Sequence, residues 1–217
     1  MDFATARRKM VDNQVRPNEV TDLRLVAAML EIPRERFVPA ERAATAYMDG
    51  NVALDDAGRV LLEPMVVGRL IQTADVKDTD HVLDVACGTG YSSAILSRLA
   101  GSVVALEEDP NLADRAARNL KELGVANAKI VSGPLDAGWP VEAPYDLVLL
   151  NGAVEYVPES LLAQLKEGGR LLAIVGGAPV GEAMLYRNAA GDVSSRPVFD
   201  ATAPVLPGFA KPKSFVF

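Results

Sequence analysis

A glycine turn and a carboxylate one strand further on are the residues of this chain best suited to chemistry. The segment VLDVACGTGY, residues 82–91, is an apolar stretch that runs into the turn Gly88-Thr89-Gly90. Glu107 ends the next apolar stretch, VVALE. A carboxylate at that place can accept hydrogen bonds from both hydroxyls of a ribose, and the glycines let the backbone approach the rest of a nucleoside. Together the two features predict a site for a nucleoside-derived cofactor.

The same turn does not indicate a dinucleotide. A pyrophosphate loop has the pattern G-x-G-x-x-G, but here Gly90 is followed by Tyr91, Ser92 and Ser93. The chain also has no G-x-x-x-x-G-K-[ST] loop for a nucleoside triphosphate. The pattern that is present, D-x-x-C-G-T-G, resembles the cofactor loop of the class I S-adenosylmethionine-dependent methyltransferases. The alternative is a tight turn between a strand and a helix with no ligand.

Four predicted strands bring candidate residues to one edge of a sheet. In an open α/β sheet the ligand lies beyond the carboxyl ends of the strands, where the strand order switches. The residues expected there are Asp84, Ala86, Cys87, Gly88, Thr89, Gly90 and Tyr91 after the first strand, Glu107 and Glu108 after the second, Ser132, Gly133, Pro134 and Leu135 after the third, and Asn151 and Gly152 after the fourth. The third group stands where an adenine ring would be flanked.

Several of these residues also have a purely structural interpretation. Asp84 either orients the methionine amine of the cofactor or hydrogen-bonds the amides of its own loop. Glu107 is placed for ribose because it directly ends its strand, whereas Glu108 or Asp109 could instead cap the following helix. Cys87 is interpreted as a small packing residue rather than a nucleophile.

The elements that must position these residues alternate between strand and helix from residue 81 onward. Near-continuous apolar runs predict strands at residues 81–86, 102–107, 128–132, 145–151 and 170–176. Helices are predicted at residues 91–100, 111–123 and 158–168. This order predicts an α/β fold with a Rossmann-like, doubly wound and mostly parallel sheet.

Helices are expected before the sheet and a hairpin after it. In residues 1–50 a helix capped by Thr21 carries an apolar stripe of Leu23, Leu25, Val26, Met29 and Leu30. Residues 50–63 read as a loop or short hairpin, and Pro64 begins a helix through Ile71. Residues 182–201 predict an antiparallel hairpin, and Lys213 to Phe217 add a short strand or lie over the sheet. We expect one domain over 1–217, with parts 1–63, 64–176 and 177–217.

Composition excludes several classes of function. The chain has 217 residues, 49% of them hydrophobic and 24% charged, enough to bury a full core. No run of about 18 apolar residues and no signal-peptide pattern is visible, so we expect a cytoplasmic protein with no membrane partner. One cysteine, Cys87, and one histidine, His81, argue against a disulfide framework and a metal site. A net charge of −7 gives no general attraction to nucleic acid.

Over roughly residues 15–180 the chain resembles the protein-L-isoaspartate O-methyltransferases, which methylate isoaspartyl carboxylates in damaged proteins. The similarity rests on three blocks. They are VAAMLEIPRERFVPAERAATAYMD, HVLDVACGTGYSSAILSRLAGSVVALEEDPNLADRAARNL and GWPVEAPYDLVLLNGAVEYVPESLLAQLKEGGRLLAIVG. The first block, with its Pro-Arg-Glu-Arg-Phe-Val-Pro segment, is not a general methyltransferase feature.

Two family motifs are altered at functional positions. The resemblance implies a G-Q-T-I-S-x-P segment near the donor and the substrate carboxylate, but this chain has Gly58-Arg-Val-Leu-Leu-Glu-Pro64. Both hydroxyls are missing, with Leu62 in the place of the serine and Arg59 and Glu63 as new polar groups. The family's G-D-G after the third strand, with its aspartate near adenine, is replaced by Gly133-Pro134-Leu135.

The sequence therefore favours an S-adenosylmethionine-dependent O-methyltransferase that acts in protein repair on an isoaspartyl carboxylate, held against residues 58–64. A carboxylate with an ordinary pKa of about 4 needs no general base, so the lack of a catalytic histidine is no obstacle. Two alternatives stay open. One is a methyltransferase with a different acceptor, and the other is a non-catalytic relative with a regulatory or interaction role.

Overall fold

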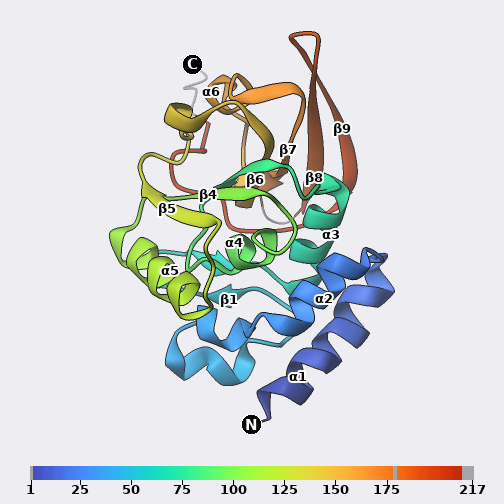
Figure 1. The fold of residues 1–217 in the computed structure, drawn as a ribbon, viewed down its shortest axis with the longest axis vertical. Coiled ribbons are helices and arrows are strands. Elements are labelled where there is room, and N and C mark those ends of the chain that lie inside the picture. Colours follow the sequence, from blue (N-terminus) through green and yellow to red (C-terminus); the bar gives the residue numbers. More distant parts are fainter. Residues whose placement is uncertain (1, 178–179, 212–217) are drawn as a thin grey trace, which may run out of the picture.

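A seven-stranded sheet forms the centre of the computed structural model, which describes residues 2–177 and 180–211 (Figure 1). The strand order is β5-β4-β3-β6-β7-β8-β9. The strands are β3 (His81–Val85), β4 (Ser102–Glu107), β5 (Ala128–Ser132), β6 (Tyr145–Val154), β7 (Leu165–Gly177), β8 (Val180–Ala189) and β9 (Asp192–Asp200). Strands β3 to β7 pair in parallel, and β8 and β9 add an antiparallel edge. The predicted fold class and the C-terminal hairpin are confirmed.

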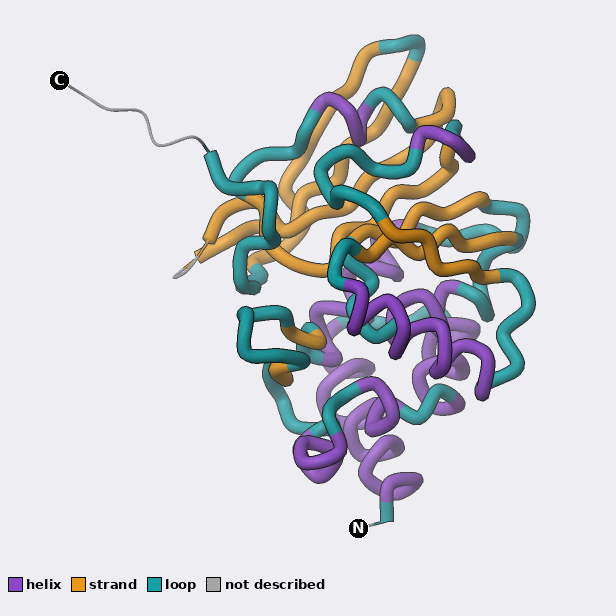
Figure 2. The backbone as a smooth tube through the Cα atoms, turned by 90° about the vertical axis from the view of Figure 1, so that its left-hand side faces the viewer, coloured by secondary structure: helices purple, strands orange, loops and turns teal. Residues whose placement is uncertain are grey.

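Most helices lie on one face of this sheet, as Figure 2 shows. The N-terminal ones are α1 (Phe3–Met10), the π-helix η1 (Val11–Val15), η2 (Arg16–Asn18), α2 (Leu23–Glu31), and the 3-10 helices η3 (Arg34–Phe37) and η4 (Ala40–Thr45). Later come α3 (Pro64–Ala74), α4 (Tyr91–Leu96), α5 (Pro110–Glu122), η5 (Pro140–Glu142) and α6 (Glu159–Leu162). Between η4 and α3, β1 (Val52–Ala53) and β2 (Val60–Leu61) form a small antiparallel hairpin. In the described ranges, no helix is long and apolar enough to cross a bilayer.

Apolar side chains cover both faces of the sheet, because successive residues of a strand point to opposite sides. Val82 and Val103 face the core that includes the N-terminal helices. Leu83 and Val104 face a second core, which contains Leu161 of α6. On this second face the cover includes the short helix α6, the segment around residues 133–144 with η5, and Leu206 and Phe209 near the C-terminal end of the described chain.

The strand order places the candidate residues that follow β3 and β4 at the same end of the sheet. From β3 the chain passes through α4 to β4 and through α5 to β5, and then returns to β6 beside β3. The order therefore switches between β3 and β6, and ligands of open α/β sheets bind beyond the carboxyl ends of the strands at such a point.

Three details of the predicted helices are wrong. Asp22, not Thr21, caps α2, because the Asp22 carboxylate accepts hydrogen bonds from the backbone of Arg24 and Leu25. Leu23 is 75% exposed and lies outside the apolar stripe, whereas Leu25, Val26 and Met29 are buried. Helix α4 ends at Leu96 rather than at residue 100.

The predicted helix 158–168 is also wrong beyond Leu162. The carbonyl of Gln164 accepts a hydrogen bond from the backbone of Tyr145, and Leu165 pairs with Tyr145 in the sheet. The chain has therefore joined β7 where the sequence pattern predicts two further helical turns. The predicted strand at Lys213 to Phe217 lies outside the described residues.

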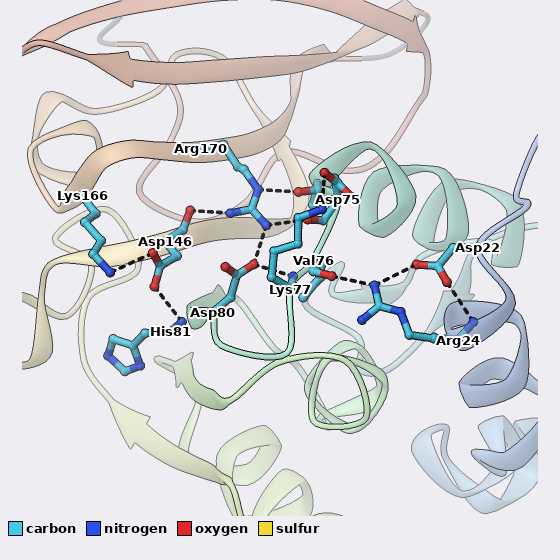
Figure 3. Close-up of polar contacts among 11 residues, drawn as sticks. Asp22, Arg24, Asp75, Val76, Lys77, Asp80, His81, Asp146, Lys166 and Arg170 are labelled. Carbon is cyan, nitrogen blue, oxygen red and sulfur yellow. Dashed lines mark hydrogen bonds and ion pairs between the residues drawn. The ribbon is translucent and has the colours of Figure 1, made fainter.

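A polar network holds the opposite edge of the sheet, at the amino ends of the strands (Figure 3). The guanidinium of Arg170 in β7 donates to Asp80 Oδ2 at 2.5 Å and to the carbonyls of Asp75 and Asp146. It also donates to the carbonyl of Ala74 at the end of α3. This network ties α3 to β3, β6 and β7, away from the candidate site.

Candidate functional site

The glycine turn between β3 and α4 is buried and folded as the pattern predicts. Ala86, Gly88 and Gly90 have positive φ angles of 58°, 58° and 91°. At Gly88 an added Cβ would lie 2.9 Å from Cδ1 of Leu54. Glycine at this position therefore permits close approach of another segment, which here belongs to the protein itself.

Asp84 at the end of β3 is fully buried and held by neutral side chains. Its Oδ2 accepts hydrogen bonds from Ser92 Oγ at 2.8 Å and from Ser93 Oγ at 2.5 Å, and its Oδ1 accepts one from Asn151 Nδ2 at 2.6 Å. Burial raises the pKa of Asp84 to about 6, although these hydrogen bonds favour the charged form. The Asp84 carboxylate connects the end of β3 to the start of α4 and to β6. Its predicted role of binding the amine of a ligand stays a prediction.

Glu107 at the end of β4 is completely buried and accepts five hydrogen bonds. Arg59 Nη1 and Nη2 reach its two oxygens at 2.7 and 2.8 Å. The backbone N–H groups of Gly88, Glu108 and Asp109 donate to the same carboxylate at 2.8, 3.0 and 3.1 Å. A carboxylate offers about four lone-pair sites, so protein groups saturate this one.

Arg59 thus lies against the predicted ribose carboxylate instead of facing an acceptor. Its side chain is 7% exposed, and Nη2 also donates to the carbonyl of Ala86 at 3.1 Å. Burial acts to lower the pKa of the Arg59 guanidinium, but the hydrogen bonds and the charge of Glu107 outweigh it and raise that pKa. The sequence pattern predicts Arg59 on the acceptor side, and in the structure it pairs with Glu107, the carboxylate predicted for the cofactor ribose.

The other two predicted acceptor-side residues flank the start of α3. Leu62 is buried, and its carbonyl accepts a hydrogen bond from the buried Arg34 at 2.7 Å. Glu63 is half-buried at the N-cap position of α3, and its backbone N–H donates to Asn51 Oδ1. Burial raises the pKa of Glu63, and the nearby charge of Asp49 adds to the effect. A polar carboxyl is therefore available beside Leu62.

The remaining candidates lie around the same edge. Pro134 is exposed, while Leu135 is buried in the core on the second face. Glu108 is exposed, and Asp109 caps α5 by accepting from the backbone of Asn111 and Leu112. The capping role that the sequence left open between two acidic residues thus belongs to Asp109.

Aromatic and thiol groups of the turn serve packing. Tyr91 is buried below the guanidinium of Arg34, which lies 4.9 Å from its ring centre, and Thr89 donates its hydroxyl to the carbonyl of Phe37. Cys87 is buried, and burial raises the pKa of its thiol well above the ordinary value.

A nucleoside does not fit the site in this arrangement. The cavity between the glycine turn and residues 54–67 has a volume of about 10 Å³, at the lower limit of what a single water molecule needs. Small-molecule sites usually have several hundred Å³, roughly 300–1,000. The carboxylate expected to hold ribose is already saturated, so the predicted cofactor residues are assembled but covered.

Sequence reasoning missed the residues that cover and order the site. Ser92 and Ser93 hold Asp84, and their place directly after the glycine turn is a signal that could have suggested it. Leu54 and Asp55 lie in a segment that the pattern describes only as a loop or hairpin. In residues 2–177 and 180–211, no cluster of three or more His, Cys, Asp or Glu side chains could hold a metal ion.

Comparison with known proteins gives one consistent family. A family model described as protein-L-isoaspartate(D-aspartate) O-methyltransferase matches residues 5–200. A protein-L-isoaspartate O-methyltransferase of Methanoculleus marisnigri is 38% identical over 170 residues, covering 78% of this chain and 77% of the relative. One of Rhodopseudomonas palustris is 36% identical over 202 residues, covering 88% of this chain and 92% of the relative.

Solved structures have the same fold. A protein-L-isoaspartate O-methyltransferase structure gives a TM-score of 0.81 at 26% identity over 93% of this chain and 66% of that one. A putative relative from Plasmodium falciparum, solved in complex with S-adenosyl-L-homocysteine, gives a TM-score of 0.77 at 19% identity, with 92% and 97% covered. The chain therefore belongs to the protein-L-isoaspartate O-methyltransferase family of S-adenosylmethionine-dependent methyltransferases.

Proposed function

We propose that this protein transfers a methyl group from S-adenosylmethionine to the free carboxylate of an isoaspartyl residue in a damaged protein. The observation that carries the proposal is the family match over residues 5–200. The glycine turn, Asp84 and Glu107 at the carboxyl ends of β3 and β4 support it, because they lie at the switch in strand order.

For methyl transfer to a carboxylate, the protein mainly has to position the donor and the acceptor. An acceptor carboxylate is already ionised near neutral pH, so no proton has to be removed. The donor would supply an activated methyl group, and the protein must orient the acceptor and exclude water. Glu63, half-buried beside Leu62, and the backbone of residues 58–64 border the place where we expect the acceptor.

An isoaspartyl peptide and its aspartyl twin test this proposal. The full chain is incubated with labelled S-adenosylmethionine and each peptide in turn, and base-labile methyl ester is counted as released methanol. We expect ester on the isoaspartyl peptide alone. A known family enzyme serves as the positive control. If that enzyme methylates the peptide and this protein does not, the substrate assignment is wrong.

A second candidate function keeps the donor and changes the acceptor. It is favoured by the segment Gly58 to Pro64, in which Arg59 pairs with Glu107 and Leu62 is buried where the family resemblance implies a serine. Losing one hydrogen bond to a charged group costs on the order of 1.5–3 kcal/mol, so two losses weaken recognition of an isoaspartyl carboxylate strongly. Tight binding of S-adenosylhomocysteine without isoaspartyl turnover would favour this candidate.

A further inference from the structure

Residues 51–62, hereafter the covering hairpin, lie over the glycine turn. The hairpin consists of β1, a turn and β2, and its Leu54 contacts Gly88. Leu54, Leu61 and Leu62 line the cavity of about 10 Å³ together with Cys87 of the turn. These residues of the covering hairpin close the place where we expect the donor.

The turn of the covering hairpin is built to present Arg59. Asp55 Oδ1 accepts hydrogen bonds from the backbone N–H groups of Ala57 and Arg59, both at 2.9 Å. The backbone of Leu54 donates to the carbonyl of Arg59 at 2.8 Å, and Gly58 has a φ angle of 96°. These contacts fix the backbone of Arg59, so its guanidinium is directed at Glu107.

The guanidinium makes the contacts that a ribose would make. Two hydroxyls of a ribose would each donate to the carboxylate at the end of β4, and Arg59 donates once to each oxygen of Glu107. Bidentate bonds between a guanidinium and a carboxylate are among the stronger hydrogen bonds in proteins. A nucleoside and Arg59 therefore compete for one carboxylate.

We propose that the covering hairpin is an autoinhibitory segment, in which Arg59 occupies the ribose position on Glu107 and excludes the methyl donor. The donor binds only to molecules in which Arg59 has left Glu107. Because few molecules are open in this way, the apparent affinity for the donor is much lower than the affinity of the open form. This inference rests on the proposed function for the identity of the donor.

The turn of the covering hairpin can open while the base of the hairpin stays packed, because residues 56–58 are exposed whereas Val52, Leu61 and Leu62 are buried in the core. Its two strands have two residues each, and such isolated hairpins are at best marginally stable in water. Its ends are anchored at Asn51, which accepts a hydrogen bond from the backbone of Glu63 and donates to the carbonyl of Thr202. Burial of the Arg59–Glu107 ion pair also costs desolvation free energy, which is recovered when the hairpin opens and water reaches the two charges.

Equilibrium binding of S-adenosylhomocysteine is the first test. The variants Arg59→Ala and Leu54→Ala are compared with the natural chain by calorimetry. Arg98→Ala is the matched control, because Arg98 pairs with Glu31 on the surface, away from the site. Both hairpin variants are expected to bind at least about tenfold more tightly than the natural chain, and the control to bind equally. Leu54→Ala weakens the packing of the covering hairpin on Gly88 but does not leave Glu107 as an unpaired buried charge. This variant therefore tests the proposal even if Arg59→Ala does not fold.

The reactivity of Cys87 is a second readout that requires no donor. Cys87 is the single cysteine of the chain and lies beneath the covering hairpin. Reaction with an uncharged dithiodipyridine reagent is expected to be slow in the natural chain and at least about tenfold faster in Arg59→Ala. Loss of the Arg59 charge by itself would raise the pKa of the thiol, so faster reaction reports exposure and not activation.

The two readouts separate failure of this inference from failure of the proposed function. Tight binding to the natural chain, with equal or weaker binding to both hairpin variants, would overturn autoinhibition and leave the function intact. If no variant binds S-adenosylhomocysteine, the donor assignment fails, and with it the exclusion of that donor by Arg59. Unchanged Cys87 reactivity in both hairpin variants would show that Arg59 and Leu54 do not hold the site closed, which also overturns the proposal.

Discussion

Two buried carboxylates, Asp84 and Glu107, lie near the carboxyl ends of the neighbouring strands β3 and β4, and their charges are compensated in different ways. Glu107 is paired with a guanidinium, whereas the side chains that donate to Asp84 are all neutral. A buried carboxylate without a cation favours its protonated form, and this accounts for the raised pKa of Asp84. A ligand ammonium would supply the missing charge, which supports placing the amine of the donor beside Asp84.

The stability of the protein should therefore depend on the ionisation of Asp84. Its pKa is about 6 in the folded protein against 3.8 for an unperturbed aspartate. The protonated Asp84 side chain contributes to the free energy of unfolding fully below about pH 4, and this contribution is lost as the pH rises through 6. Relative to Asp84→Asn, the natural chain should lose on the order of 2–3 kcal/mol of unfolding free energy between pH 4 and 7. Urea unfolding at a series of pH values measures this difference, and parallel curves would contradict the prediction.

At the scale of elements, the sequence pattern predicts the strands well but does not predict which distant segments contact each other. The apolar runs predict β4 and β5 with their observed ends, because buried parallel strands have a continuous apolar pattern. Helix α6 is short because Leu165 pairs with Tyr145, and no local pattern encodes that pairing. The contact between Arg59 and Glu107 joins two segments 48 positions apart, so motif spacing could identify each residue but not their pairing.

The cap of α5 offers a test at the scale of one element. Asp109 accepts hydrogen bonds from the backbone of Asn111 and Leu112 at 2.8 and 3.0 Å. Asp109→Ala removes both acceptors and should lower the unfolding free energy by about 1 kcal/mol. Asp109→Asn keeps a capping oxygen and should cost only a few tenths of that. Thermal unfolding of both variants checks the difference, and equal losses would show that capping is not the cause.

Across the whole molecule, the two edges of the sheet have different tasks. The covered site lies at the carboxyl edge, where, in the proposed mechanism, a ligand replaces Arg59 on Glu107. At the amino edge, the buried side chain of Arg170 connects α3, β3 and β6 through hydrogen bonds (Figure 3). A rigid amino edge keeps the strands in register while the covering hairpin moves, because the hairpin makes none of these contacts.

Arg170→Met should therefore destabilise the entire domain and not one end of it. The change leaves Asp80 and the carbonyls of Ala74, Asp75 and Asp146 without their buried donor. Removing one partner of a buried ion pair costs about 3–5 kcal/mol, and we expect a loss of this size in urea unfolding. Arg187→Met is the matched control, since Arg187 faces Arg170 in the register of β7 and β8 but is exposed. Cys87 reactivity under native conditions should stay close to that of the natural chain in both variants, because the covering hairpin is untouched. A loss no larger than that of the control would show that the amino edge does not hold the sheet together.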